Sequence, residues 1–428
     1  MTRLLCLALL LLLPARAGAA DDWPQFRGPD GQGHAPAADP PLTWSEQENV
    51  RWKTAIPGEG WSSPVVLGRQ IWMTTAVDRG HSLRAVCVDR DSGSVLHDVE
   101  VFHIEQPESV NTKNSYASPT PVIEHGRVYV HFGTNGTACL ATATGSILWK
   151  NTSLKLEHKE GPGSSPILYG DFLIVNCDGM DVQYVVALNK HTGRIAWKTD
   201  RTGKPADNPD WRKAYSTPLV IQAAGHAQLI SSGAGQVVAY NPATGRELWK
   251  VRYKGFSAVP RPSFGDGLLF VVTDFGRPQL WAMRPGGSGD EGSGDEGSGD
   301  LTDTAVAWRA TRQISAAPSP LLVGEQLYLV TNRGVASSID AKTGKSIWTE
   351  RLGGDYSASP TLAGGRIYIP SEDGRTYVLE PGREYKLLAT NQLDGRQMAS
   401  PAFCGPAIFL RTDKHLYRLE AGERANRK

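Results

Sequence analysis

The 428-residue sequence lacks most of the patterns that mark metal sites, nucleophilic enzymes or nucleic-acid-binding proteins. Its 45 basic and 44 acidic residues give a formal net charge of +1, so electrostatics give no reason to expect nucleic acid as a partner. The ten His residues show no HxH or HExxH spacing, and there is no Cys-x-x-Cys or GxSxG motif. We therefore predict no metal site and no such catalytic centre. A literal GxGxxG at Gly287, Gly289 and Gly292 lies in a low-complexity stretch that opens no helix, so it does not predict a dinucleotide site.

Long apolar runs are also scarce. Leu4–Leu13 is too short to span a bilayer. It follows a basic start and precedes a Pro and the small residues Ala17-Gly18-Ala19, so residues 1–20 are predicted to be a secretory signal peptide. We expect a periplasmic or extracellular protein with no transmembrane segment. Cys6 lies inside the apolar run and not at the cleavage position, so no lipid-anchor cysteine is predicted.

Only five cysteines occur, and four of them follow residue 20. Each of the four stands alone in a strand-like stretch of a different repeat. We favour buried thiols, although an oxidising compartment also permits disulfides. The four are Cys87, Cys139, Cys177 and Cys404.

Helical periodicity is almost absent, and short Val/Ile/Leu/Tyr-rich runs broken by Gly, Pro, Asp and Asn predict an all-β fold. Internal repeats accompany these runs. Ser118–Lys150 reads SPTPVIEHGRVYVHFGTNGTACLATATGSILWK, and Ser216–Lys250 and Ala317–Glu350 follow the same order. Each unit opens with Ser/Thr-Pro or a related pair and continues through three more strand-like runs. Counting the openings, which include Ser118-Pro119 and Val259-Pro260, predicts eight units of four strands.

A second signature closes each unit. The pattern D/N-x-x-T/S-G is followed four residues after its Gly by a Trp, as in Gly145 and Trp149. The Asx side chain and the Gly fit a hairpin turn, since Asx bonds backbone amides and Gly accepts positive φ. In the first unit His97 takes the place of the Trp. We predict that the Trp residues dock between neighbouring units. They are Trp52, Trp149, Trp197, Trp249, Trp308 and Trp348.

Four-stranded units of this length stack as the blades of a propeller, because a single unit cannot bury both faces of its sheet. The last unit, from Ser400, lacks its Trp strand, whereas VRWKTAI stands alone before the first unit. We predict that this N-terminal strand pairs with His415–Leu419, which closes the ring and removes an exposed sheet edge. The expected propeller covers residues 49–422.

The D/N-x-x-T-G-x-x-x-W-K pattern resembles the repeat of pyrroloquinoline-quinone (PQQ) propellers, a family that includes quinoprotein dehydrogenases and BamB-like scaffolds. The resemblance extends over Asn49–Glu420. The opening DWPQFRGPDGQG resembles the mature N-terminus of secreted propeller proteins common in planctomycete-like bacteria.

The resemblance leaves two functions open, because one fold serves both. A BamB-like propeller is a non-catalytic scaffold that binds proteins or peptides and needs no cofactor. A quinoprotein dehydrogenase of this family would hold PQQ and calcium and oxidise an alcohol or a sugar. The family's vicinal Cys-Cys pair is missing here, and no motif matches its calcium ligands. We therefore favour the monomeric, non-catalytic scaffold, with PQQ and calcium as the alternative.

Aromatic residues precede several unit openings, where the chain passes from one blade to the next. These positions are expected at one mouth of the central channel, and polar residues stand near them. Such a rim fits a ligand or a peptide, whereas the rings could equally pack between blades. The candidates are Trp61, Tyr116, Tyr215, Tyr356, Lys113, Arg212 and Arg396.

Three segments fall outside the repeat. Residues 21–48 are rich in Pro and Gly but contain Trp23 and Phe26, which predicts a capping segment anchored on the propeller. Residues 286–300 form an acidic Gly/Ser insertion that is expected to be a flexible surface loop or an acidic contact. Residues 423–428 are assigned to a tail.

Overall fold

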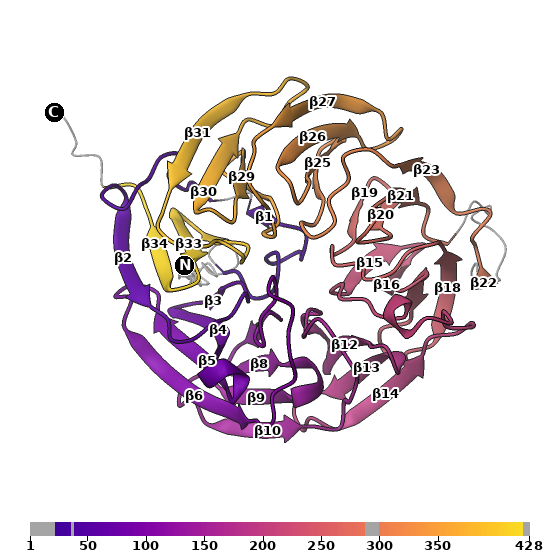
Figure 1. Cartoon of the computed structure of the whole chain (residues 1–428), viewed down its shortest axis with the longest axis horizontal. Helices are drawn as coiled ribbons and strands as arrows, with labels where there is room; N and C mark the ends of the chain where they lie inside the picture. The colour runs from indigo at the N-terminus through magenta and orange to yellow at the C-terminus, as the bar shows by residue number, and fades with distance from the viewer. Residues whose placement is uncertain (1–21, 36–37, 287–298, 423–428) are drawn as a thin grey trace, which may run out of the picture.

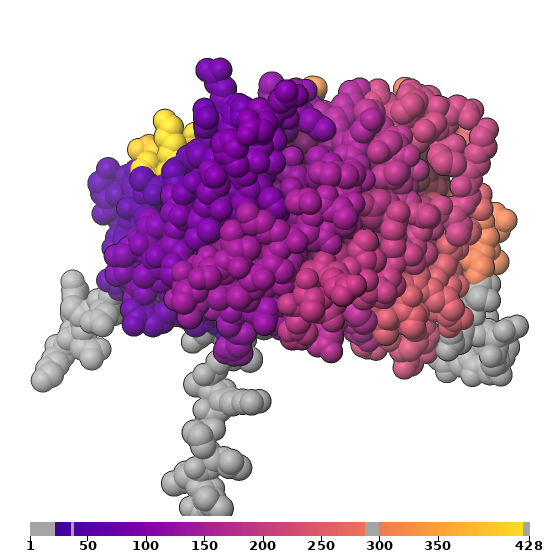
Figure 2. Space-filling model, turned by 90° about the horizontal axis from the view of Figure 1, so that it is seen from below, coloured from indigo at the N-terminus to yellow at the C-terminus, as the bar shows by residue number. Residues whose placement is uncertain are grey.

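The computed structural model describes residues 22–35, 38–286 and 299–422, and it shows a ring of eight β-sheets around a central axis (Figure 1). The predicted signal peptide (1–20), the tail (423–428) and most of the acidic insertion lie outside the described residues. Seen from the side, successive blades lie next to one another along the wall of a thick disc (Figure 2). Among the described residues, no helix is long and apolar enough to cross a bilayer. The all-β, eight-bladed fold predicted from the repeats is confirmed.

Each blade is an antiparallel sheet whose first strand is the innermost. Blades 1 and 2 consist of β3 (Val65–Leu67), β4 (Gln70–Val77), β5 (Ser82–Asp89) and β6 (Val95–His103), then β7 (Val122–Glu124), β8 (Arg127–His131), β9 (Thr137–Ala141) and β10 (Ile147–Asn151). Blades 3 and 4 consist of β11 (Ile167–Tyr169), β12 (Phe172–Asp178), β13 (Gln183–Asn189) and β14 (Ile195–Asp200), then β15 (Leu219–Ala223), β16 (His226–Gly233), β17 (Gln236–Tyr240) and β18 (Glu247–Arg252).

The second half of the ring repeats this order. Blades 5 and 6 consist of β19 (Ser263–Gly265), β20 (Leu268–Val272), β21 (Leu280–Met283) and β23 (Val306–Ala310), then β24 (Leu321–Val323), β25 (Gln326–Val330), β26 (Val335–Asp340) and β27 (Ser346–Arg351). Blade 7 consists of β28 (Thr361–Ala363), β29 (Arg366–Pro370), β30 (Arg375–Leu379) and β31 (Leu387–Gln392). Blade 8 consists of β32 (Ala402–Cys404), β33 (Ala407–Arg411), β34 (His415–Leu419) and β2 (Val50–Ala55).

The ring closes through strands from opposite ends of the chain. The strand β2 pairs antiparallel with β34, and Trp52 lies opposite Arg418 while Thr54 lies opposite Leu416. The predicted pairing of the N-terminal strand with the last blade is therefore confirmed. It gives the last blade its fourth strand, so the outer edge of this sheet ends like those of the other blades.

Most of the repeat's Trp residues lie against the Gly of the following blade's turn. A Cβ on Gly193, whose φ is +71°, would stand 2.4 Å from the Trp149 ring. The indole nitrogen of Trp149 also donates to the Lys190 carbonyl at 2.9 Å. Gly thus serves two needs at this position, a left-handed turn and a flat surface for the indole. Trp52, Trp197 and Trp308 make the same contact with Gly93, Gly245 and Gly344 of the following blades.

Trp249 departs from this pattern because blade 5 has the acidic insertion where the D/N-x-x-T-G turn would stand. Here the short strand β22 (Gly299–Asp300), at the described end of the insertion, pairs parallel with β18 and lies beside Trp249. Trp249 is fully buried, and its indole nitrogen donates to Gln228 of its own blade at 2.8 Å. An added edge strand therefore extends blade 4 beyond β18, and the Trp249 ring packs in a core cluster with Trp281 and Ala305 of blade 5.

The N-terminal segment runs across one face of the ring, and its strand β1 (His34–Ala35) lies near the ring's centre in Figure 1. Trp23 is 1 % exposed and exchanges two backbone hydrogen bonds of 2.8 Å with Val66 of blade 1. Further along, the segment accepts a backbone hydrogen bond from Ile123 of blade 2, and β1 pairs parallel with β28 of blade 7. One stretch of chain thereby contacts inner strands on opposite sides of the ring.

The four cysteines that follow residue 20 are all buried, and they form no disulfide in the described structure. Burial raises the pKa of the Cys139 thiol to about 11 and those of Cys87 and Cys177 to about 12. Such thiols stay protonated and unreactive at neutral pH. The predicted buried thiols agree with this arrangement.

Candidate functional site

At seven of the eight blades, the residue two positions before the innermost strand lines the central channel and carries a hydroxyl group. These seven residues, which we call the hydroxyl ring, are Ser63, Thr120, Ser165, Thr217, Ser319, Ser359 and Ser400. Arg261 holds the eighth position. The openings assigned from sequence at Ser118-Pro119 and Val259-Pro260 are therefore two residues too early, because these segments contain Pro at alternate positions.

The hydroxyl ring connects neighbouring blades. The backbone N–H of Ser63 donates to Thr120 Oγ1 at 3.0 Å, that of Thr120 to Ser165 Oγ at 2.9 Å, and that of Ser165 to Thr217 Oγ1 at 3.0 Å. The second half of the ring repeats the pattern. The N–H groups of Arg261, Ser319 and Ser359 donate to Ser319, Ser359 and Ser400 at 3.0, 3.0 and 2.9 Å. These hydroxyl groups therefore tie the inner strands together around the axis.

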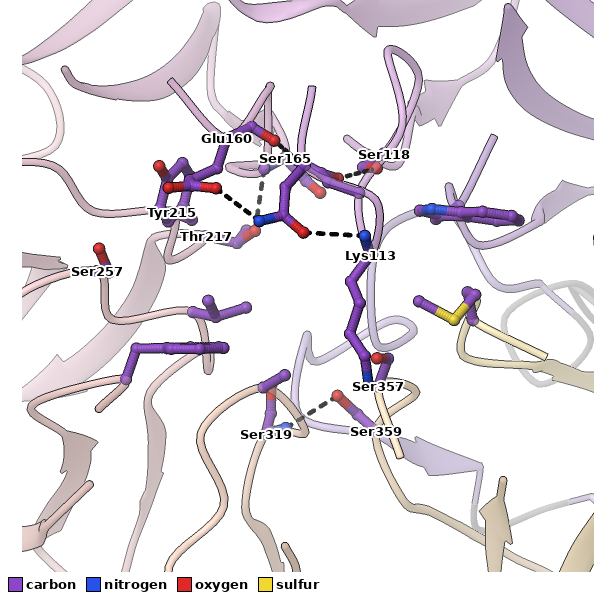
Figure 3. Close-up of a pocket in the computed structure, with 18 of the residues that line it drawn as sticks. Lys113, Ser118, Glu160, Ser165, Tyr215, Thr217, Ser257, Ser319, Ser357 and Ser359 are labelled. Atoms are coloured by element: carbon purple, nitrogen blue, oxygen red, sulfur yellow. Dashed lines mark hydrogen bonds between the residues drawn. The ribbon is translucent and has the colours of Figure 1, made fainter. Parts of the chain in front are cut away.

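The hydroxyl ring encloses a central cup of about 600 Å³. Phe26 of the N-terminal segment lines its lower end, and the opposite end opens at a mouth lined by Trp61, Lys113, Tyr215 and Phe256. Figure 3 shows Ser165, Thr217, Ser319 and Ser359 of the hydroxyl ring around the opening, and the Lys113 side chain reaching across it toward Ser357. The cup thus has an aromatic floor, a hydroxyl-lined wall and a mixed aromatic and charged mouth.

Most charged groups at the mouth have a polar or oppositely charged partner. Lys213, although buried, donates to the Asp210 backbone carbonyl at 3.0 Å and lies 3.9 Å from Glu160. Asn111 donates to Glu160 at 2.8 Å, and its own side-chain oxygen accepts the Lys113 N–H at 2.9 Å. These contacts join the loop between blades 1 and 2 to the connection between blades 2 and 3.

A second charged cluster lies across the mouth. Glu372 accepts hydrogen bonds from Ser357 at 2.7 Å and from Arg396 at 3.1 Å, and the Lys113 ammonium lies 3.5 Å away. Burial acts to raise the pKa of Glu372, but these donors outweigh it and leave the pKa below its usual value. Arg396 also lies over the Trp61 ring, 5.8 Å from its centroid. Lys113 therefore spans the mouth from blade 1 to blade 7.

The structure brings together only part of the predicted site. Trp61, Lys113 and Tyr215 line the cup, and Arg396 contacts Trp61. Tyr215 donates its hydroxyl to the His158 carbonyl at 2.8 Å, which leaves the ring to face the cup.

Three predicted residues lie elsewhere. Tyr356 is 0 % exposed in the core that blades 6 and 7 share. Tyr116 packs against Gly80 and the apolar core of blades 1 and 2. Arg212 donates to the carbonyls of Ala206 and Asp207 and lines a neighbouring pocket.

Two exposed aromatic residues beside the cup were missed at the sequence level. Trp211 is 53 % exposed and stacks on Phe256, with ring centroids 5.9 Å apart. Phe275 is 47 % exposed, and its N–H donates to the Phe256 carbonyl. Trp211 follows the polar sequence NPD, and Phe275 lies in the turn TDFGRP. An aromatic residue within a polar turn was the sequence feature that could have indicated these two exposed rings. We call Trp211, Phe256 and Phe275 the aromatic trio.

The cup does not fit the calcium centre of a quinoprotein. Among the described residues, no group of three or more His, Cys, Asp or Glu side chains could hold a metal ion. Glu160 is the one carboxylate among the residues that line the cup, and it is already bound by Asn111. Calcium takes six to eight oxygen ligands from carboxylates, carbonyls and water, and its affinity depends on the number of charged ligands. No reaction step through PQQ and calcium is therefore derived.

The ring of blades defines an eight-bladed β-propeller, and a concave cup lies on its axis. The family described as "Outer membrane protein assembly factor BamB" matches residues 84–250, 182–289 and 297–416. Because these segments cover more than half of the chain, the chain belongs to this family.

Relatives agree with this membership. The outer membrane protein assembly factor BamB of Shewanella oneidensis is 23 % identical over 313 residues, which are 67 % of this chain and 69 % of that protein. The BamB of Alkalilimnicola ehrlichii is 29 % identical over 221 residues, so the chain spans about half the length of that relative.

Solved structures resemble the fold at low identity. BamB from Moraxella catarrhalis has a TM-score of 0.60 and 12 % identity, with 87 % of this chain and 99 % of that chain covered. Quinohemoprotein alcohol dehydrogenase from Comamonas testosteroni has a TM-score of 0.63 and 11 % identity, with 96 % and 82 % covered. Both likenesses concern the fold alone, since one propeller carries different functions.

Proposed function

We propose that this protein is a non-catalytic binding propeller that holds a peptide segment of a partner protein on its mouth face. The observation that carries the proposal is the aromatic trio, because two of its rings are about half exposed beside a concave site. Large exposed aromatic side chains are the residue type that most often anchors protein interfaces. The family's description as an assembly factor supports a protein partner.

The pocket on the other side of the trio suggests the chemistry of that partner. It has a volume of about 530 Å³, and Asp274 is the one acidic residue among its lining. Its basic residues are Arg201, Lys204, Arg212, Arg252 and Lys254. Arg201 is neutralised by Asp178 at 2.5 Å, Lys204 pairs with Asp207 at 3.0 Å, and Arg252 pairs with Asp300 at 2.8 Å. The remaining positive charge, on Arg212 and Lys254 against Asp274, complements an acidic peptide, so we propose a segment with an apolar anchor next to acidic residues.

The predicted site residues also contribute to this surface. Tyr215 lies on the trio's side of the mouth, since its backbone N–H donates to the Ala258 carbonyl at 2.9 Å, whereas Lys113 and Arg396 lie near Glu372 of blade 7. Trp61 and Tyr215 offer aromatic faces, while Lys113 and Arg396 offer charge that is already partly matched. A small molecule in the cup is the other ligand compatible with these residues. We further propose a monomeric propeller that acts in the periplasm or outside the cell. The signal-peptide pattern of residues 1–20 and the family's description support this location.

The likeness to a quinohemoprotein fold supports the dehydrogenase alternative. The scarcity of metal-binding side chains among the described residues opposes it. Purified protein incubated with PQQ and calcium should develop no quinone absorbance band and no alcohol- or sugar-dependent reduction of a dye. Turnover in this assay would replace the binding function with an oxidoreductase.

Site-specific photo-crosslinking in the native source tests the binding function. A photoreactive phenylalanine analogue at Phe275 should form a crosslinked band with one protein, whereas the same analogue at Leu387 should not. Leu387 is a suitable control because it is similarly exposed, at 44 %, but lies on the outer strand β31. Equal crosslinking at both positions, or none at Phe275, would contradict a partner on the mouth face.

A further inference from the structure

The hydroxyl ring leaves hydrogen-bond donors unused. Six of its oxygens accept a backbone N–H from the preceding blade. In the described structure, none of these six hydroxyls donates a hydrogen bond to another protein group. Each is at least nine-tenths buried, with at most 6 % exposure, and each lines the cup. A hydroxyl that accepts one bond can still rotate its hydrogen toward a second acceptor.

Several donors that converge on one space favour an acceptor with negative charge. A hydrogen bond to a charged acceptor is roughly twice as strong as one between neutral groups. Leaving a buried donor without a partner has an energetic cost. A ligand with charged oxygens would satisfy several ring hydroxyls at once, and an apolar ligand would satisfy none.

The wall behind the cup is positively charged. Arg261 occupies the eighth ring position and donates to the carbonyls of Phe26 at 2.7 Å and Pro218 at 3.1 Å. Arg411, between blades 8 and 1, donates to the Ser62 and Thr74 carbonyls at 3.1 and 2.8 Å. Within the described residues, neither guanidinium forms an ion pair with a carboxylate.

Burial has a large effect on the pKa of both arginine side chains. It lowers the pKa of Arg411 to about 9, and burial together with the nearby charge of Arg27 lowers the pKa of Arg261 to about 9. Both groups still carry charge at neutral pH. Asp30 is the acid whose charge acts on Arg27 and Arg261, and it is already bonded to His34 at 2.6 Å. Buried cations whose partners are neutral carbonyls create a positive field that favours an anion nearby.

The body of the cup is apolar. Phe26 forms its floor, and Val259, Ala317 and Met398 line its sides. The cations at the mouth, Lys113 and Lys213, already have acidic neighbours. Among the described residues that line the cup, these two lysines are the only cationic side chains. A doubly charged phosphate would need direct cationic contacts, whereas a singly charged carboxylate would not.

We propose that the cup binds an organic carboxylate, with its oxygens on the hydroxyl ring and its apolar body against Phe26. The ligand comes from one of two sources, a free small acid or the carboxylate of a bound peptide. The site does not require the aromatic trio, so it stands independently of the proposed partner on the mouth face.

Fluorine NMR titration of the full-length mature protein tests this proposal. The probe is 4-fluorobenzoate, with 4-fluorobenzyl alcohol as the neutral control and 4-fluorophenyl phosphate as the dianionic control. We expect saturable one-to-one binding of the carboxylate below about 10 mM and at least about tenfold weaker binding of the alcohol. No saturable binding of the benzoate, equal binding of the alcohol, or tighter binding of the phosphate would overturn the proposal.

A matched pair of variants at the cup wall tests the location. Ala317→Asp and Ala317→Asn differ in charge but hardly in size, and Ala317 belongs to no hydrogen bond of the ring. The Asp variant should weaken benzoate binding about tenfold or more, and the Asn variant should change it less than about threefold. Equal effects would place the probe elsewhere and overturn the proposal.

A second variant, which adds no charge, keeps the proposal testable if Ala317→Asp does not fold. Ser359→Ala removes one ring donor and should weaken benzoate binding about tenfold while alcohol binding stays unchanged. An unchanged affinity for benzoate would overturn the role of the ring. N-acetyl-Ala-Phe as the free acid and as the amide then distinguishes the sources. Tighter binding of the peptide acid than of benzoate indicates a peptide terminus, whereas weaker binding indicates a free small acid.

Discussion

Substituting Gly193 by Ala tests the contact that joins blade 2 to blade 3. The φ of +71° at Gly193 disfavours Ala by about 1 kcal/mol. The new Cβ would lie 2.4 Å from the Trp149 ring, so the ring must move. Overpacking of this kind costs about 1–3 kcal/mol, and losing the indole hydrogen bond to Lys190 adds about 1 kcal/mol. We therefore expect Gly193→Ala to lower the free energy of unfolding by about 3–5 kcal/mol.

Gly170 in the same blade provides the matched control. Its φ is +54°, but a Cβ there meets nothing within 4 Å, so Gly170→Ala should cost only about 1 kcal/mol. Calorimetry should therefore show a Tm for Gly193→Ala roughly 3–5 °C below that of Gly170→Ala, given the unfolding entropy of a chain this long. In a Trp149→Ala background the two substitutions should become equivalent, because the ring is gone. Equal Tm values in the original background would refute the docking argument.

Other predictions concern pH, ring closure and the N-terminal segment. Burial lowers the pKa of His131 to about 3 and of His158 to about 4. Below pH 6.5 the unfolded chain therefore binds more protons, so acidification from pH 7 to 5 should remove about 2 kcal/mol of stability per His, measured by urea unfolding. An unchanged midpoint would contradict this. Trp52→Ala should lower the unfolding free energy by about 2–4 kcal/mol, and a loss below 0.5 kcal/mol would argue against closure through β2. Trp23→Ala should speed amide exchange of β3, and unchanged exchange would contradict anchoring of the N-terminal segment.

Much of the fold was predictable because the repeat encodes it locally. The turn pattern that ends at Gly193 specifies a left-handed residue, and the Trp four residues later specifies the outer strand. The strand around Trp52 stands outside the repeats, and the last blade lacks its fourth strand. The pairing of these two ends of the chain was therefore predictable as well. These features depend on short-range backbone chemistry, which a single sequence displays.

The site was less predictable because linker position does not determine side-chain direction. Tyr215 and Tyr356 occupy similar positions before their blades, yet one faces the cup and the other is enclosed by the core of blades 6 and 7. The alternate prolines around Thr120 also hid the true register of the ring. The role of Trp211 and Phe275 was not predictable, because the exposure of their rings depends on how separate loops pack against one another.

The central claim is that the aromatic trio holds a partner on the mouth face. Once crosslinking at Phe275 has identified that partner, its affinity for the purified propeller can be measured by biolayer interferometry. A Trp211→Ser/Phe275→Ser variant should bind at least about 100-fold more weakly, since two anchors worth about 2 kcal/mol each are removed. The control Leu387→Ser, on the outer strand, should bind as the native protein does. Native affinity in the double variant would contradict the account.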